Sequence, residues 1–103
     1  MLAMELIPTI RARLEQLEAE RANGPGPGRD ALASGHRAAL WRAQQHAARI
    51  DNTLEDLRRF CLESLHSWHF VDEQDENDYL RGYRQGFQAV LKDIRAAESR
   101  RVT

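Results

Sequence analysis

The sequence predicts an all-α protein, built as a long helical hairpin with a linked N-terminal helix in a small bundle. Apolar residues recur at helical spacing in three segments, and no segment shows the apolar–polar alternation that is typical of a half-buried strand. The composition, 42% hydrophobic and 30% charged, is that of a folded, helix-rich protein. With 103 residues the chain can bury one modest core, so we expect a single domain.

Residues 1–23 are predicted to form the N-terminal helix. Its apolar face consists of Leu6, Ile10, Leu14 and Leu17, with charged residues opposite them. A proline fits only the first turn of a helix, so Pro8 indicates that the regular helix begins close to it. Glycine and proline alternate directly after this segment. We therefore predict a linker at residues 24–29, between this helix and the hairpin of residues 30–103.

The second segment ends near residue 70 and carries an apolar residue every seven positions. The repeat consists of Leu40, Ala47, Leu54, Cys61 and Trp68, with Ala43, Ile50 and Leu57 at companion positions. Such a stripe is typical of a long packed helix, so we expect one helix over residues 34–70, bent near Asn52. The alternative is two helices, because Asn52 followed by Glu55 resembles a capping box, which would begin a new helix there.

The third segment is predicted to form a helix over residues 75–100. An acidic run at residues 72–78 precedes it, and carboxylates stabilise the positive end of the helix dipole. Its apolar face consists of Leu80, Tyr83, Phe87, Val90, Leu91, Ile94 and Ala97. The acidic run could also bind calcium or a basic partner. It lacks the loop glycine and terminal glutamate of an EF-hand, however, which favours helix capping.

Two glycines in the third helix give the strongest functional signal. A glycine inside a helix costs about 1 kcal/mol relative to alanine, so Gly82 and Gly86 need compensation from close packing. With Tyr79, Tyr83 and Phe87 they form a face that is predicted to meet another helix, in a protein-binding site or a dimer interface. Packing against the preceding helix of the same chain is the alternative. Tyr83 and Phe87 fall at the centre of the apolar arc, and Gly82 falls nearer its edge.

The two tryptophans are also candidates for the protein-binding or dimer interface, because tryptophan often anchors interfaces. Trp68 occupies a position on the heptad stripe, where packing is the simpler interpretation. Trp41 lies off that stripe. Either the N-terminal helix or a second subunit covers it, or a partner protein contacts it.

A metal site is not favoured. His66 and His69 are three residues apart, with Cys61 before them and acidic residues after them. These side-chain types can bind zinc, but there is no second cysteine and no zinc signature is matched. We therefore predict no metal and no cofactor, and a metal-binding sensor is a less favoured alternative.

Catalysis and nucleic-acid binding are also not favoured. The chain has no phosphate-binding glycine loop and no nucleophile elbow, so we expect no enzyme activity. The net charge of −1 gives no general attraction for nucleic acids. The second segment is nevertheless locally basic through Arg37, Arg42, Arg49, Arg58 and Arg59. A nucleic-acid-binding regulator that uses this helix is therefore the main alternative.

The chain shows no signal for export or membrane insertion. No apolar run reaches the roughly 18–20 residues that a membrane helix needs, and no basic region precedes the N-terminal apolar residues. A single cysteine excludes an intramolecular disulfide and fits a reducing compartment. We expect a cytoplasmic protein without membrane contact.

The preferred hypothesis is a non-enzymatic, protein-binding regulator or inhibitor that occludes a surface of a larger partner protein. An anti-activator or a phage-type inhibitor, from a bacterium or a phage, would fit the balanced charge and the aromatic–glycine face. We also expect a homodimer, because the heptad stripe exposes more apolar surface than one hairpin partner covers.

Overall fold

The computed structural model describes residues 2–22, 27–66 and 78–102, and the regular structure within them is helical. The elements are the 3-10 helix η1 (Ala3–Leu6) and the α-helices α1 (Ile7–Ala22), α2 (Pro27–Ala47), α3 (Leu54–His66) and α4 (Asp78–Val102). The prediction of an all-α protein is confirmed. The start of α2 lies inside the range 24–29 that was predicted as a linker. In the described ranges, no helix is both long and apolar enough to cross a membrane.

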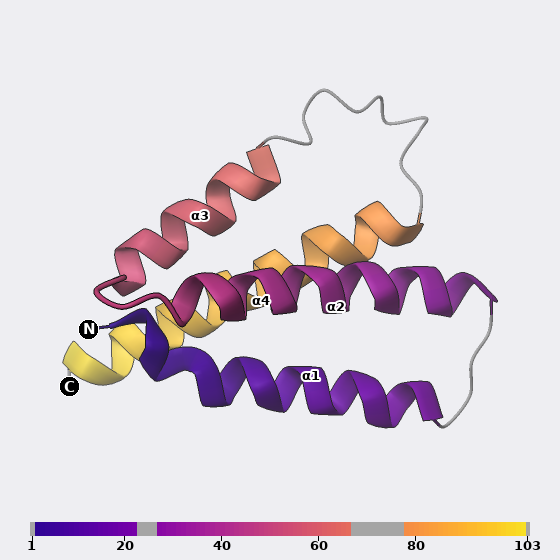
Figure 1. Ribbon diagram of the computed structural model, residues 1–103, viewed down its shortest axis with the longest axis horizontal. Helices are drawn as coiled ribbons and strands as arrows, with labels where there is room; N and C mark the ends of the chain where they lie inside the picture. The colour runs from indigo at the N-terminus through magenta and orange to yellow at the C-terminus, as the bar shows by residue number, and fades with distance from the viewer. Residues whose placement is uncertain (1, 23–26, 67–77, 103) are drawn as a thin grey trace.

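α2 and α4 form the central pair of the bundle, and α1 and α3 lie on either side of this pair (Figure 1). Gly35 on α2 lies against residues 79–83, and Gly86 on α4 lies against residues 36–39, so the two central helices run in the same direction. α1 and α3 run in the opposite direction (Figure 1). The helix that packs most closely on α4 is therefore α2, which runs parallel to it. α3 packs on α4 in the antiparallel direction.

One core connects the four α-helices. Its largest fully buried side chains are Phe87, Ile10, Leu40, Leu57, Ile94, Val90 and Cys61. Burial of a large apolar side chain contributes about 1.5–3 kcal/mol relative to leaving it in water. Because every α-helix supplies at least one of these residues, the core holds all four in place.

Residues 34–70 do not form one helix. α2 ends at Ala47 and α3 begins at Leu54, so the prediction of a long helix bent near Asn52 is wrong, and the alternative of two helices is correct. In the turn, Asp51 has a φ of 72°, a left-handed conformation that aspartate tolerates better than most residues. The Asn52 side-chain Nδ2 donates a hydrogen bond to the His46 carbonyl at 2.9 Å, which satisfies an acceptor at the end of α2.

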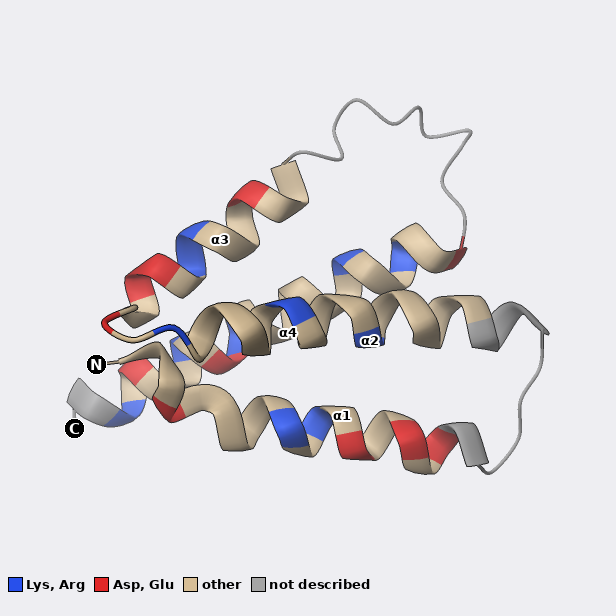
Figure 2. Ribbon diagram, in the orientation of Figure 1, with Lys and Arg blue, Asp and Glu red and all other residues tan. Residues whose placement is uncertain are grey.

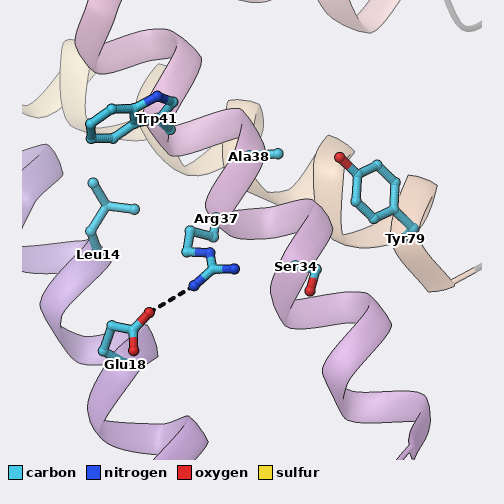
Figure 3. A pocket seen from close by; sticks show the side chains of 7 residues that line it. All are labelled: Leu14, Glu18, Ser34, Arg37, Ala38, Trp41 and Tyr79. Carbon is cyan, nitrogen blue, oxygen red and sulfur yellow. Dashed lines mark hydrogen bonds and ion pairs between the residues drawn. The ribbon is translucent and has the colours of Figure 1, made fainter.

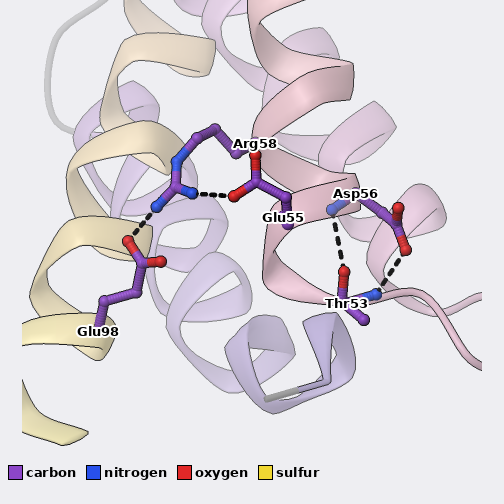
Figure 4. A network of polar contacts seen from close by, with 5 residues as sticks. All are labelled: Thr53, Glu55, Asp56, Arg58 and Glu98. Carbon is purple, nitrogen blue, oxygen red and sulfur yellow. Dashed lines mark hydrogen bonds and ion pairs between the residues drawn. The ribbon is translucent and has the colours of Figure 1, made fainter. Parts of the chain in front are cut away.

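A capping box begins α3, one residue later than the sequence suggested (Figure 4). The Asp56 N–H donates to Thr53 Oγ1 at 3.1 Å, and the Thr53 N–H donates to the Asp56 carboxylate at 2.9 Å. Hydrogen bonds from Thr53 hold the pKa of the Asp56 carboxyl below its ordinary value. Two donors at the start of the helix are thus satisfied reciprocally, which favours a helix start at this point.

The seven-residue repeat survives this interruption because Ala47 and Leu54 are themselves one repeat apart. Four of its positions are buried, two in α2 and two in α3: Leu40, Ala47, Leu54 and Cys61. Ile50, predicted on the same stripe, lies in the turn and is 81% exposed, so that prediction is wrong. The stripe is used for packing within the chain. Its fifth position, Trp68, lies outside the described residues.

The N-terminal segment docks on the α2–α3 turn. The Ala3 N–H donates to the Asn52 carbonyl at 2.8 Å, and Leu2 forms an isolated antiparallel bridge with Thr53. Ala3 and Leu6 are buried there. The chain then continues as α1 along the side of α2, so the N-terminal helix is an integral part of the bundle.

A bidentate ion pair joins α1 to α4. The Arg13 Nε and Nη2 atoms donate to the two Asp93 carboxylate oxygens at 2.6 and 2.7 Å. Asp93 is only 9% exposed, so its charge depends on this partner. The hydrogen bonds to Asp93 also raise the pKa of the Arg13 guanidinium above its ordinary value. The pair fixes α1 relative to the central helices.

Candidate binding site

The glycines of the predicted interface lie between α2 and α4. A Cβ atom built on Gly82 would lie 1.9 Å from the Leu32 carbonyl oxygen, and one built on Gly35 would lie 1.9 Å from the Tyr79 carbonyl oxygen. The two helix backbones are therefore in direct contact at this level. The prediction that Gly82 lies near the edge of the packed face is wrong, because a second helix covers it completely.

Gly86 extends this contact by one turn. Its Cβ would lie 2.6 Å from the Ala39 Cβ and 2.8 Å from the His36 carbonyl oxygen. Sequence reasoning missed Gly35, the glycine on the opposite helix. The signal was present, since Gly35, Ala39 and Ala43 follow one another at four-residue spacing and match the spacing of Gly82 and Gly86.

The aromatic residues of α4 lead from this interface to the surface. The Tyr83 and Phe87 rings pack edge to face with centroids 4.9 Å apart, and both residues are buried. The Tyr79 ring stacks on Tyr83 at 6.3 Å and is 41% exposed. Tyr83 and Phe87 are thus core residues of the chain, and Tyr79 is the accessible member of the predicted aromatic face.

An open pocket of about 520 Å³ lies beside Tyr79 and joins α1, α2 and the start of α4 (Figure 3). We name this site the Trp41 groove and define it by its lining residues, Leu14, Glu18, Ser34, Arg37, Ala38, Trp41 and Tyr79. The small side chains of Ser34 and Ala38 lie between Tyr79 on one side and the Leu14–Trp41 pair on the other (Figure 3).

Trp41 is the most accessible aromatic anchor in this groove, with 53% of its surface exposed. Leu14 of α1 lies beside the indole but leaves half of it open (Figure 3). One alternative for Trp41 was that the N-terminal helix covers it. The structure shows that α1 covers it only in part. An exposed tryptophan beside small residues is a surface that gains free energy when an apolar side chain covers it.

One arginine, Arg37, lines the groove, and a second, Arg42, lies beside it on α2 just outside the lining residues. Arg37 donates to the Glu18 carboxylate at 2.8 Å, on the side of α1 (Figure 3). Arg42 donates to the Tyr83 hydroxyl at 2.9 Å, and its guanidinium carbon lies 5.9 Å from the centroid of the Tyr83 ring. The groove thus combines an apolar floor with oriented hydrogen-bond donors, an arrangement suited to binding a side chain or a helix.

Burial lowers the pKa of two histidines of α2, His36 and His46. Burial and the nearby charge of Arg13 lower the pKa of His36, and Glu20 opposes this only in part. His46 stacks on the Phe60 ring with centroids 4.3 Å apart, and burial together with Arg49 lowers its pKa. Both imidazoles therefore take part in packing, and neither lines the groove.

The candidate metal ligands are not assembled in the described residues. Cys61 faces the core, and burial raises the pKa of its thiol to about 12, so the thiolate that a metal needs is disfavoured. Across residues 2–22, 27–66 and 78–102, no three His, Cys, Asp or Glu side chains are grouped to hold a metal ion. His69 and the acidic residues at 72 and 73 lie outside these ranges.

The arginines of the predicted basic segment are divided between two helices. Arg37 pairs with Glu18, and Arg58 pairs with both Glu55 and Glu98 (Figure 4). α1 and α3 each carry both acidic and basic residues (Figure 2). These arginines therefore do not form one continuous basic helix.

Comparison of the chain with protein-family models, with curated proteins and with solved structures found no match.

Proposed function

We propose that the chain is a non-enzymatic, protein-binding regulator or inhibitor that binds a helical segment of a larger partner in the Trp41 groove and thereby occludes it. The observation that carries this proposal is the half-exposed Trp41 beside a floor of small residues. Tryptophan, tyrosine and arginine are the residues that most often dominate binding energy at interfaces. All three types border this groove.

The size and lining of the groove also favour a helix as its ligand. A volume of about 520 Å³ is comparable to that of small-molecule pockets, so the groove has room for side chains of a partner helix. Ser34 and Ala38 are one turn apart on α2, so the groove follows the axis of this helix. A partner helix can place apolar side chains against Trp41 and Leu14 while its polar face stays in water.

Affinity capture from the source cell tests this proposal, with Trp41→Ala and Leu62→Ala as a matched pair. Both substitutions shorten an exposed apolar side chain, but Leu62 lies on α3, outside the groove. We expect the Leu62→Ala protein to retain the partner. Trp41→Ala should weaken binding about thirtyfold, as the loss of an interface anchor does. Equal capture of one partner by both variants, at unchanged thermal stability, would contradict the proposal.

We propose further that the chain forms a homodimer through the end of the bundle near the α2–α3 turn. Leu40, Ala47, Leu54 and Cys61 of the heptad stripe that predicted self-association are buried within the chain, so we assign the interface to another apolar surface. Leu2, Met4 and Ile50 are exposed, and hydrogen bonding joins their two segments at this end. The mass of the protein in solution, with Ile50→Glu as the dissociating variant, tests this assignment. A monomer at micromolar concentrations would contradict it.

A further inference from the structure

We infer that the segment bound in the Trp41 groove is an acidic amphipathic helix, with an apolar row flanked by carboxylates on the side that faces Arg42. This inference rests on the proposed function and specifies the chemistry of the partner. It follows from the charges that line the groove and from the charge of Arg42 beside it.

On the side of α1, the two charged residues that line the groove form an ion pair with each other. Arg37 and Glu18 both line the groove and pair with each other at 2.8 Å, so each cancels the charge of the other (Figure 3). A partner helix gains little from placing a charge of either sign on this side. This side therefore sets the position of the apolar row but not the charge of the partner.

On the side of α4, an arginine just outside the lining residues has no acidic partner within the described residues. Arg42 follows Ala38 by one helical turn and lies on the side of α2 that faces α4. It is exposed, and within the described residues no carboxylate forms an ion pair with it. The nearest acidic residue along the start of α4, Asp78, is directed at Arg81, with 4.0 Å between the charged atoms.

Arg42 is also held in position before any partner binds. Its Nη1 atom donates to the Tyr83 hydroxyl at 2.9 Å, and Tyr83 is itself fixed by edge-to-face packing on Phe87. The planar guanidinium presents further N–H donors in a fixed fork that matches a carboxylate. Because the side chain is already ordered, less conformational entropy is lost when it binds an anion. The groove therefore favours a ligand with carboxylates next to its apolar row.

Fluorescence anisotropy with three labelled synthetic helices tests this inference on the full-length protein. The peptides share one row of leucines at helical spacing and carry glutamate, glutamine or lysine at the flanking positions. We expect the glutamate peptide to bind about tenfold or more tightly than the lysine peptide. Rising salt should weaken the glutamate peptide most, because exposed charges are screened.

Substitution of Arg42 assigns the preference to one residue. Arg42→Gln should weaken the glutamate peptide about two- to fivefold, as expected for an exposed ion pair, and leave the glutamine peptide unchanged. The matched control is Arg59→Gln, which removes the same charge from the exposed surface of α3. Arg42→Glu should reverse the order, so that the lysine peptide binds more tightly than the glutamate peptide. A reversal cannot arise from misfolding.

The outcomes separate this inference from the proposed function. Binding of all three peptides with equal affinity, lost in Trp41→Ala, would overturn the acidic character of the partner and leave the groove as a binding site. Self-association that blocks the peptides and is lost in Trp41→Ala would also overturn it, since a second copy would then be the ligand. Binding of no peptide, together with unchanged partner capture by Trp41→Ala, would overturn both.

Discussion

α2 presents small residues on two sides, and only one of these sides is closed. Toward α4, Gly35 and Ala39 meet Gly82 and Gly86, and the helix backbones touch. Toward solvent, Ser34 and Ala38 form the floor of the Trp41 groove, which nothing in the described part of the chain fills. Small residues therefore permit close approach on both sides. The difference is that α4 brings glycines of its own to one side, whereas the other side is bordered by an exposed tryptophan.

The largest loss of stability should come from adding a side chain on the side of α2 that is closed by α4. In Gly82→Ala the new methyl group would lie 1.9 Å from a backbone oxygen of Leu32, so α2 and α4 must separate. We expect a loss of about 3 kcal/mol or more in the free energy of unfolding, far more than the roughly 1 kcal/mol that alanine gains in a helix. Urea denaturation measures this. Gln85→Ala, at an exposed position of α4, is the control and should leave the stability nearly unchanged. An equally stable Gly82→Ala protein would show that the two backbones are not in contact.

A smaller effect on stability is expected from breaking ion pairs, and the loss should be greater for the buried pair than for the pair at the groove. Arg13→Met leaves the Asp93 carboxylate without its bidentate partner in a largely buried position, at a cost of about 2 kcal/mol. Arg37→Met breaks the exposed pair with Glu18 and should cost less than about 0.5 kcal/mol. Chemical denaturation of the two variants compares them directly. Equal losses would mean that α1 is not anchored mainly through Asp93.

The smallest expected effect is a dependence of stability on pH through His36 and His46. Their pKa values are lower in the folded chain than the ordinary histidine value of 6.5, so the unfolded chain takes up protons first as the pH falls. The stability contributed by the neutral imidazoles is complete above pH 6.5 and is lost as the pH falls through the folded-state values. Unfolding at about pH 7.5 and about pH 5.5 should show this loss, and the double substitution His36→Gln and His46→Gln should reduce it. A stability that rises over this interval would contradict the assignment.

The helices themselves could be predicted because their signals are local. The apolar spacing in α1 and α4 and the proline and glycine after α1 depend only on neighbours in sequence. The break between α2 and α3 was harder to place. Ala47 and Leu54 are seven residues apart on either side of the turn, so the repeat continues across it and resembles one helix. The capping box that begins α3 is formed by Thr53 and Asp56. From the sequence alone, Asn52 and Glu55 were an equally plausible pair for a capping box.

The binding site could be predicted only in part, because it depends on how the helices are paired. The sequence indicated Trp41 and Tyr79, which the structure brings to one pocket. It also indicated Gly82, Tyr83 and Phe87, which the structure buries. No local sequence pattern indicates that α4 packs parallel to α2. This pairing determines which aromatic residues of α4 are buried. Leu14 and Ala38 could not be predicted as lining residues either. They come from α1 and α2, and the sequence of neither helix alone shows that the two are in contact.

We expect adjacent small residues of α2 to have different roles, one in closing the fold and one in binding. Ala38 and Ala39 test this expectation most directly, because the same substitution can be made at neighbouring positions. Ala39 is buried against Gly86, whereas Ala38 lines the groove. In urea denaturation we expect Ala39→Leu to lose about 1–3 kcal/mol or more of stability through overpacking. Ala38→Leu should stay within about 0.5 kcal/mol of the parent protein, because Ala38 is only partly buried and the longer side chain can extend into the groove. Equal losses at the two positions would contradict this expectation.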